Sequence, residues 1–193
     1  SLGRVQYIDA PPGELRAGRE YILGFDGGST TTKVALVDME TSRVCASHYG
    51  RTHGNPIEAL RKCLVAVNAE IREKAGGEIR VTLAAVTGSS RELLSVFCET
   101  SGVYNEIIAH ATGTSFYDPG IDTIFEIGGQ DAKYVLLKNG VPIDYAMNEA
   151  CSAGTGSFLE ESASGDLDIT DVRDIGRIAM EADAPLKFGE HCS

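Results

Sequence analysis

Two stretches of the sequence share a pattern that decides the fold: residues 25–36 read FDGGSTTTKVAL, and residues 125–136 read FEIGGQDAKYVL. A phenylalanine, an acid, a glycine, a lysine and a leucine recur at an offset of 100 residues. Such a period is too long for a solenoid repeat and indicates a duplicated lobe. In each stretch a strand pattern ends near the acid and a second begins after the glycines. We therefore expect two hairpin turns, one in each half of the chain.

The residue types in both turns suit a polyphosphate and its metal ion. A carboxylate at a strand end can face a hydrated Mg²⁺, and glycines without Cβ atoms let backbone N–H groups approach phosphate oxygens. The hydroxyl residues of the first turn can donate hydrogen bonds, its lysine adds charge if it turns inward, and the amide and carboxylate at the tip of the second can orient water. The candidate residues are Asp26, Gly27, Gly28, Ser29, Thr30, Thr31 and Lys33 in the first turn, and Glu126, Gly128, Gly129, Gln130 and Asp131 in the second.

Either turn alone is equally well interpreted as an ordinary hairpin in which glycine only supplies a positive φ. The pairing of two turns with matching acids favours a ligand site. The sequence lacks the pattern Gly-x-x-x-x-Gly-Lys-Ser/Thr of a P-loop, and no Gly-x-Gly-x-x-Gly leads from a strand into a helix. Nucleotide binding would therefore have to use the hairpins.

Composition restricts the class of protein. The 193 residues are 42% hydrophobic, which is enough for a core, and 28 acidic against 17 basic residues give a formal charge of −11. Nucleic acid is an unfavourable partner for such a surface. No stretch reaches the roughly 20 apolar residues of a membrane span, and residues 1–19 lack the apolar centre of a signal peptide. With an odd set of five cysteines, these features predict a cytoplasmic protein with reduced thiols or metal ligands rather than disulfides.

The order of expected elements predicts an α/β protein with a mixed sheet of five strands and helices. Residues 1–19 are interpreted as a linker from a longer parent chain, 20–120 as a complete first lobe, and 121–193 as the truncated start of a second. Strands are expected at 21–25, 33–38, 44–49, 81–86, 106–109, 123–127, 132–137 and 141–146. Helices are expected from residue 56 to about 71, at 90–98 and 111–117, and near 154–162 and 172–182.

Two of the cysteines lie in glycine-containing stretches. Cys151 stands in NEACSAGTGSFL at residues 148–159, ahead of a helix whose N-terminus would stabilise a thiolate, and Cys192 in FGEHCS at 188–193. Two thiolates cannot complete a four-iron cluster, but a symmetric dimer supplies two more. Spacing alone favours ordinary cysteines, or zinc held with His191, because no Cys-x-x-Cys marks the site.

The motifs DGGSTTTK at 26–33 and EIGGQ at 126–130 resemble the two phosphate motifs of the acetate and sugar kinase, Hsp70 and actin superfamily. The resemblance implies an actin-like, ribonuclease H-like ATPase fold of two lobes that binds ATP and Mg²⁺ between them. The usual acid of the second motif is Asp, whereas this chain has Glu126. The superfamily's adenosine-binding glycine pair would follow residue 193, so the ATP site of this chain is expected to be incomplete.

The sequence also contains IGGQDAK at 127–133 and NEACSAGTG at 148–156. Together these motifs resemble the activators of 2-hydroxyacyl-CoA dehydratases among the BadF/BadG/BcrA/BcrD-type ATPases. The similarity extends over about residues 21–192. The resemblance implies an ATPase that drives an electron from a 4Fe-4S cluster to a partner dehydratase, with Cys151 and Cys192 of both subunits of a homodimer holding the cluster. ATP would act as a switch through the helix after Cys151. The isolated chain is expected to be inactive.

Two rival functions remain open. A small-molecule kinase of the same superfamily would use Asp131 or Asp26 as base or metal ligand, and bound iron would exclude it as the main account. A non-catalytic interaction module would carry a decayed nucleotide site and structural cysteines, and ATP turnover that depends on Asp26 would exclude it.

Overall fold

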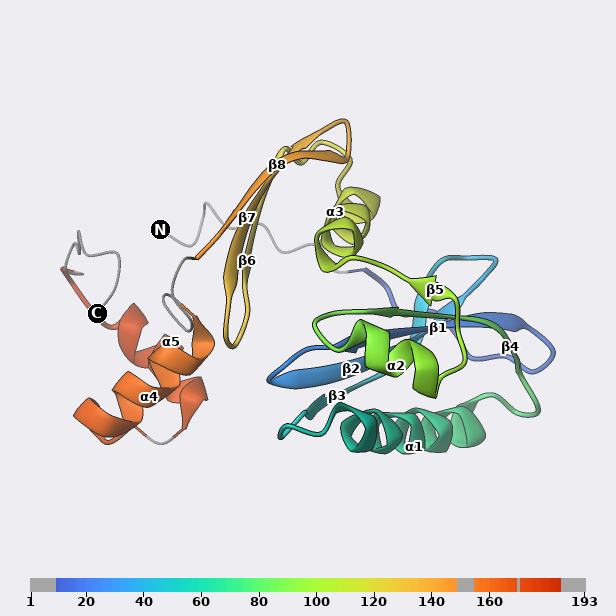
Figure 1. Cartoon of the computed structure of the whole chain (residues 1–193). Coiled ribbons are helices and arrows are strands. Elements are labelled where there is room, and N and C mark those ends of the chain that lie inside the picture. Colours follow the sequence, from blue (N-terminus) through green and yellow to red (C-terminus); the bar gives the residue numbers. More distant parts are fainter. Residues whose placement is uncertain (1–9, 149–154, 170, 185–193) are drawn as a thin grey trace. The chain divides into compact units, whose positions relative to one another are not determined.

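The computed structural model describes residues 10–148, 155–169 and 171–184, which fall into two compact units, 1–121 and 122–193 (Figure 1). The first unit contains β1 (Glu20–Gly27), β2 (Thr31–Asp38), β3 (Val44–Arg51), α1 (Pro56–Lys74), β4 (Arg80–Thr87), α2 (Arg91–Phe97), β5 (Gly102–Val103) and α3 (Glu106–Tyr117). The second contains β6 (Thr123–Ile127), β7 (Ala132–Lys138), β8 (Val141–Met147), α4 (Gly156–Leu167) and α5 (Val172–Met180).

The first unit is built on a mixed sheet of five strands in the order β3-β2-β1-β4-β5. The pairs β1–β2 and β2–β3 are antiparallel, and β1–β4 and β4–β5 are parallel. Helices α1 and α2 lie along one side of the sheet (Figure 1). Between them and the strands is a core of buried side chains that includes Tyr21, Phe25, Val34, Leu36, Leu60, Cys63, Val67, Val86 and Leu94. The mixed five-stranded sheet expected from the sequence is confirmed.

Local signals in the sequence determine where α1 begins and which side it buries. The side chain of Asn55 accepts a hydrogen bond from the backbone N–H of Glu58 at 3.1 Å, and Pro56 occupies the first turn, where its missing N–H is not needed. Leu60, Cys63 and Val67 recur at helical spacing and are 2% exposed or less. These residues therefore hold α1 against β2 and β3.

One expected strand is wrong. Residues 106–109 were expected to form a strand ahead of a helix at 111–117, but α3 covers both stretches, and the fifth strand is Gly102–Val103. The apolar pair Ile107 and Ile108 is compatible with either a strand or a helix. The side chain of Asn105 accepts from the N–H of Ile107 at 2.8 Å, and Glu106 lies in the first turn, so the local sequence starts a helix there.

Residues 10–19, part of the expected linker, form no helix or strand but are hydrogen-bonded to other segments of the first unit. The N–H of Gly13 donates to the carbonyl of Val44 at 2.8 Å, and those of Ala17 and Gly18 donate to Ala75 and Glu78, each at 2.9 Å. Residues 1–9 lie outside the described part of the chain. The described segment thus runs along the first unit.

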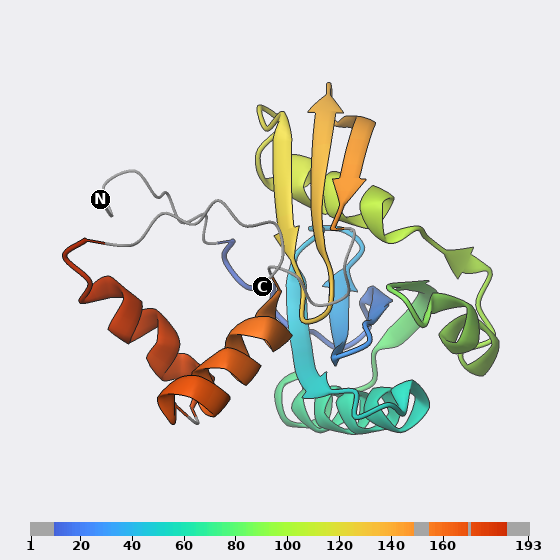
Figure 2. The ribbon, with the colours of Figure 1, turned by 60° about the vertical axis from the view of Figure 1, so that its left-hand side comes forward.

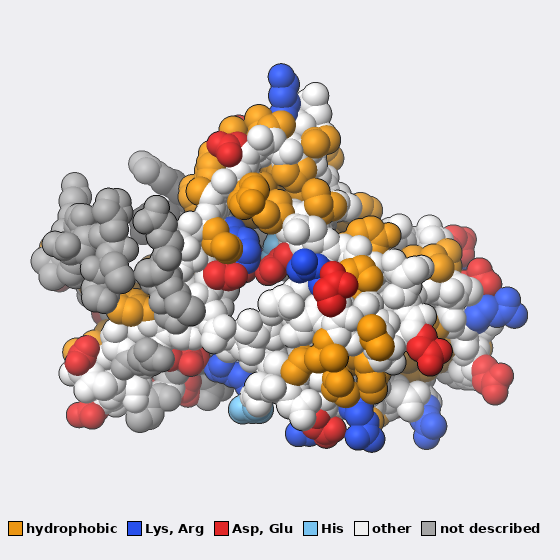
Figure 3. Space-filling view, viewed as in Figure 1, with side chains coloured by type: hydrophobic (Ala, Val, Ile, Leu, Met, Phe, Trp, Pro, Cys, Tyr) orange, Lys and Arg blue, Asp and Glu red, His pale blue; other side chains and the backbone are white. Residues whose placement is uncertain are grey.

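The second unit begins with an antiparallel sheet in the order β6-β7-β8, seen as three adjacent strands in Figure 2. Its hydrophobic side chains are unevenly buried. Val135 on the central strand is 1% exposed, but Phe125 is 74% exposed, whereas its counterpart Phe25 is 4% exposed. Figure 3 shows hydrophobic side chains gathered over β6–β8. Those that are exposed include Ile127, Val141, Ile143, Tyr145 and Met147.

A buried carboxylate closes the β2–β3 turn. Asp38 is 2% exposed and accepts hydrogen bonds from the N–H groups of Glu40 and Thr41 at 2.9 and 2.7 Å, from the Thr41 hydroxyl at 3.0 Å, and from Arg19 at 2.9 Å. Burial alone would raise its pKa, but the hydrogen bonds from Thr41, Arg19 and Glu40 outweigh burial and lower the pKa from 3.8 to about 2. The ionised form of Asp38 therefore stabilises the first unit.

Because the folded pKa of Asp38 lies below its unfolded value, its contribution to stability is present above about pH 4 and is lost as the pH falls toward 2. A pKa difference of this size corresponds to roughly 2 kcal/mol. Urea unfolding should show Asp38→Asn less stable than the original chain by about that amount at pH 7, with the difference shrinking toward pH 2. The control Asp144→Asn, at an exposed position, should change stability by less than about 0.5 kcal/mol. A difference for Asp38→Asn that stays constant from pH 7 to pH 2 would contradict this.

Candidate phosphate-binding turns

In the first unit, the turn between β1 and β2 pairs a carboxylate with a lysine. Asp26 and Lys33 are opposite each other in the antiparallel register, and the Lys33 Nζ lies 2.6 Å from Asp26 Oδ2. The turn closes with a hydrogen bond from the N–H of Gly28 to the carbonyl of Thr31 at 2.9 Å. The Lys33 side chain is 45% exposed, and its Nζ lies 5.8 Å from the ring centre of Tyr49. The Lys33 side chain therefore brings its charge to the Asp26 carboxylate.

In the second unit, the turn between β6 and β7 repeats this geometry 100 residues later. Glu126 is opposite Lys133, and the Lys133 Nζ lies 3.1 Å from Glu126 Oε2 and 2.9 Å from Asp131 Oδ1. The N–H of Gly128 donates to the carbonyl of Asp131 at 2.8 Å, just as Gly28 does to Thr31. The Lys133 side chain is only 7% exposed. The sequence repeat is therefore a repeat of register, ion pair and turn closure.

Side-chain alternation places Asp26 on the side of the sheet that α1 and α2 do not cover. Phe25 is buried in the core under these helices, so Asp26, the next residue, points to the opposite face. The strand registers add Tyr49 of β3, Lys33 of β2 and Thr87 of β4 to the same face, in a polar row across four strands. The turn tip is open to solvent, since Ser29 is exposed.

Backbone crowding explains two of the glycines at this site. A Cβ atom on Gly28 would lie 2.8 Å from the Thr31 carbonyl oxygen, so the tight closure of the turn requires glycine. Gly88, after β4, has a φ of +88°, and a Cβ there would lie 2.6 Å from Asp26 Oδ1 and 2.7 Å from the Gly27 carbonyl oxygen. Gly88 thus lets the end of β4 approach the Asp26 carboxylate closely.

The turn from β4 into α2, Thr87–Ser89, is a part of the site that the sequence analysis missed. Thr87 is the register partner of Asp26, the hydroxyls of Ser29 and Ser89 lie 3.0 Å apart, and the Ser89 hydroxyl also lies 3.3 Å from the Gly27 carbonyl oxygen. The Thr87 hydroxyl is buried and has no hydrogen-bond partner among the described residues. A Thr-Gly-Ser-Ser sequence directly after a predicted strand was the available signal.

The second turn is bound to the start of α4. The N–H of Gly156 donates to the Gly128 carbonyl at 2.9 Å, the N–H of Ser157 donates to the Gly129 carbonyl at 3.0 Å, and the Ser157 hydroxyl also donates to Gly129. The N-cap Thr155 makes no side-chain capping hydrogen bond, so the turn carbonyls take the place of a cap. The opening of α4 and the turn therefore form one hydrogen-bonded structure.

The predicted site residues fall into two sets, and each set is held within one unit. The first turn unites Asp26, Gly27, Gly28, Ser29, Thr30, Thr31 and Lys33, and the second unites Glu126, Gly128, Gly129, Gln130 and Asp131. The predicted cluster ligands Cys151 and Cys192 lie outside the described residues, as does His191. Just before the stretch that contains Cys151, the N–H of Asn148 donates to the Ala132 carbonyl at 3.1 Å, and the N–H of Ala132 donates to Asn148 Oδ1 at 3.0 Å.

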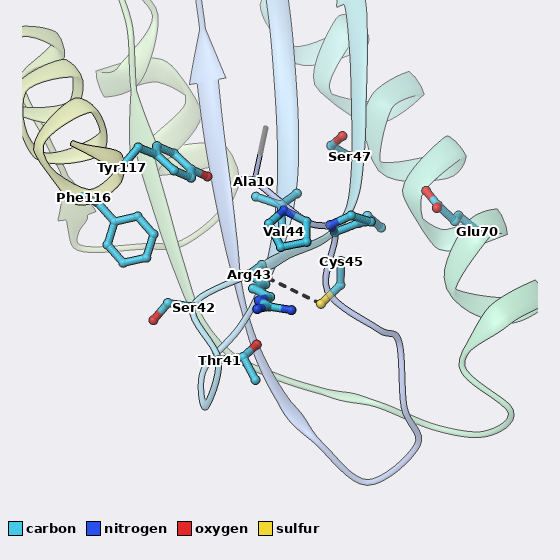
Figure 4. Close-up of a pocket in the computed structure, with 13 residues that line it drawn as sticks. Ala10, Thr41, Ser42, Arg43, Val44, Cys45, Ser47, Glu70, Phe116 and Tyr117 are labelled. Carbon is cyan, nitrogen blue, oxygen red and sulfur yellow. Dashed lines mark hydrogen bonds between the residues drawn. The ribbon is translucent and has the colours of Figure 1, made fainter. Parts of the chain in front are cut away.

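The cysteines in the described part of the chain are free thiols, fully or partly buried. Burial raises the pKa of Cys45, Cys63 and Cys98, which favours the protonated form over the thiolate that metals bind. Cys45 lies at a pocket of about 670 Å³ in the first unit, with its Sγ 3.5 Å from the Arg43 carbonyl oxygen (Figure 4). Residues of both phosphate turns are absent from the lining of this pocket, so its size does not make it the candidate site.

Comparison with known proteins identifies the family. The family model for BadF/BadG/BcrA/BcrD ATPases matches residues 23–193. This chain belongs to the BadF/BadG/BcrA/BcrD ATPase family. It is 32% identical over 157 residues to the (R)-2-hydroxyglutaryl-CoA dehydratase activating ATPase of Acidaminococcus fermentans, which covers 81% of this chain and 58% of that protein. It is also 32% identical over 178 residues to the 2-hydroxyisocaproyl-CoA dehydratase activator of Clostridioides difficile, covering 90% of this chain and 62% of that one.

The solved structures agree with the family assignment. The activator of the 2-hydroxyisocaproyl-CoA dehydratase from Clostridium difficile with bound ADPNP superposes with a TM-score of 0.73 at 30% identity, over 89% of this chain and 61% of that chain. The BadF/BadG/BcrA/BcrD chain described here has the actin-like ATPase fold, and it spans about three fifths of the length of these relatives. No described helix is long and apolar enough to cross a bilayer.

The crowding at Gly88 predicts a larger loss of stability than its positive φ alone would cause. Gly54 has a similar φ of +70°, but a Cβ there would meet nothing within 4 Å. Gly54→Ala should therefore lose about 1 kcal/mol from the left-handed backbone alone. Gly88→Ala should lose roughly 1 to 3 kcal/mol more, because the methyl group displaces the ends of β1 and β4. Urea unfolding of the two variants measures the difference, and equal losses would contradict the close approach at Gly88.

Proposed function

We propose that the whole protein is an ATP-hydrolysing activator that couples ATP hydrolysis to electron transfer from a bridging 4Fe-4S cluster to a 2-hydroxyacyl-CoA dehydratase. The observation that carries the proposal is the repeated acid–lysine hairpin turn, found in a chain that is 32% identical to dehydratase activators. Each turn offers backbone N–H groups at its tip and a carboxylate that a lysine holds, the combination that suits phosphate oxygens and Mg²⁺.

In the proposed site, each turn contributes a separate part of the ATP chemistry. The first turn would bind phosphates through the N–H and hydroxyl groups of Ser29, Thr30 and Thr31, and Asp26 would face the hydrated Mg²⁺. Lys33 holds one carboxylate oxygen of Asp26 at 2.6 Å, which fixes the orientation of the carboxylate. A related activator is solved with bound ADPNP, an observation that supports a triphosphate as the ligand of this fold.

The second turn would position the attacking water. Glu126 would face the hydrated Mg²⁺, and Gln130, which is exposed at the tip of the turn, would orient the attacking water. Asp131 shares Lys133 with Glu126, so both carboxylates are held by one buried cation. That arrangement favours an electrostatic role for Asp131 over the general-base role that a small-molecule kinase would require.

A route from nucleotide to cluster follows from the contacts of α4. The first two residues of α4 donate to the carbonyls of Gly128 and Gly129. A γ-phosphate that binds the N–H groups of the second turn would also shift these carbonyls, and the start of α4 would move with them. The start of α4 follows the stretch that contains Cys151. ATP would thus act as a conformational switch on the proposed cluster site.

The cluster is proposed to lie on the two-fold axis of a homodimer, with Cys151 and Cys192 of each subunit as ligands. Four thiolates are the number that a 4Fe-4S cluster takes, and two per subunit satisfy it by symmetry. When bound, the cluster supplies the low-potential electron for the partner dehydratase. Thiolate ligands require a reducing compartment, so a cytoplasmic location is part of the proposal.

Replacing the first carboxylate tests the nucleotide site. In the whole protein, Asp26→Asn should lower kcat for ATP hydrolysis by about 100-fold or more, because the amide carries no charge for the metal. The matched control is Glu70→Gln on α1, which removes a carboxylate held at 2.7 Å by Lys74 and should leave ATP turnover unchanged. Turnover that survives Asp26→Asn would contradict the proposed role, and a protein without ATP turnover would favour the non-catalytic alternative.

Iron and sulfide analysis of the whole protein under anaerobic conditions tests the cluster. About four iron and four sulfide per dimer are expected, falling to background in Cys151→Ser and Cys192→Ser. The partly buried Cys98→Ser should retain them. Ser157→Ala should keep the iron but weaken the effect of ATP on the rate at which a chelator removes it, because one link between turn and helix is lost. Stoichiometric zinc without sulfide would contradict the cluster.

A further inference from the structure

A buried threonine at the end of β3 holds the back of the first phosphate turn. Thr52 is 3% exposed and directly follows β3. Its backbone N–H donates to the Thr30 carbonyl at 2.9 Å, and its hydroxyl donates to the Gly28 carbonyl at 2.8 Å. The same hydroxyl lies 3.0 Å from that of Thr32, which is fully buried. One residue therefore binds two of the turn's carbonyl oxygens.

Binding these carbonyls determines where the neighbouring N–H groups point. In a trans peptide the C=O and the following N–H point in opposite directions, and the described residues contain no cis peptide bond. With the Gly28 and Thr30 carbonyls directed at Thr52, the N–H groups of Ser29 and Thr31 are directed away from it. A phosphate needs N–H groups toward it and is repelled by carbonyl oxygens. Thr52 thus selects the peptide orientation that suits an anion.

Thr52 is itself fixed by the start of α1. The N–H of Asn55 donates to the Thr52 carbonyl at 3.0 Å, and Asn55 caps the helix. Between them, His53 and Gly54 both have positive φ, at +48° and +70°, which turns the chain sharply from the strand into the helix. The hydroxyl of Thr52 therefore acts from a rigid support, and its hydrogen bond to Gly28 resists rotation of the Gly28–Ser29 peptide.

We infer that Thr52 is a positioning residue for triphosphate binding, which acts through the backbone of the first turn and does not touch the ligand. This inference rests on the proposed ATP site and adds to it a residue outside both phosphate motifs. Removing the hydroxyl leaves the Gly28 carbonyl free to rotate toward the ligand. Affinity for the phosphates should fall, while affinity for the adenosine part should not.

The test compares three threonine variants of the whole protein by calorimetric titration with ATP and with adenosine. Thr52→Val should weaken ATP binding about 10-fold while leaving adenosine binding unchanged, and Thr52→Ser, which keeps the hydroxyl, should bind ATP nearly as the original protein does. The control Thr100→Val removes a hydroxyl that donates to the Ala84 carbonyl at 2.5 Å, away from the turn, and should lower the melting temperature only.

Three results would overturn the positioning role of Thr52. Equal ATP affinity in Thr52→Val and the original protein would overturn the positioning role, and so would parallel losses for ATP and adenosine, which indicate general damage to the fold. Failure of Thr52→Ser to restore ATP affinity would also overturn it. If the original protein binds neither ligand, the proposed function fails first, and the inference that rests on it fails with it.

Discussion

The pairing of a carboxylate with a lysine across each hairpin is the interaction on which the candidate site depends. Antiparallel register sets Asp26 against Lys33 and Glu126 against Lys133, and each acid lies within two residues of a glycine of its turn. Without the lysine, each carboxylate could rotate freely in a turn that is partly open to solvent. With it, the charge has a defined direction before any ligand arrives, which is the preorganisation that electrostatic binding of a metal–phosphate complex requires.

Two aspartates of the first unit have different roles because their surroundings differ. Asp38 is buried and accepts several hydrogen bonds, so its oxygens are occupied in closing the β2–β3 turn. Asp26 has one oxygen paired with Lys33, and its side chain is 31% exposed, which leaves the other oxygen for a hydrated cation. Both residues lie at or near the end of a strand of the same sheet, and exposure together with the number of satisfied acceptors distinguishes the structural carboxylate from the candidate metal ligand.

Elements that depend on residues near in sequence could be predicted, whereas contacts between distant residues could not. Hairpins with a glycine turn, and α1 with its Asn55-Pro56 start, follow from residues near in sequence, and they were predicted correctly. The strand expected at 106–109 was wrong because apolar pairs suit either element, and a cap at Asn105 decided in favour of the helix. The contribution of Thr87–Ser89 was missed because it depends on the parallel register of β4 with β1, a contact over about 60 residues that no local pattern contains.

The hydrogen bonds between the second turn and the start of α4 have a consequence for the direction of control. Suppose that nucleotide binding moves this helix and thereby changes the reduction potential of the proposed metal centre. Thermodynamic linkage then requires that reduction of the centre changes the affinity for the nucleotide by the same free energy. The redox state of that centre would then tune how tightly ATP and ADP are held, through the carbonyls of Gly128 and Gly129. In such an activator, the affinity for nucleotide would depend on whether the metal centre is reduced.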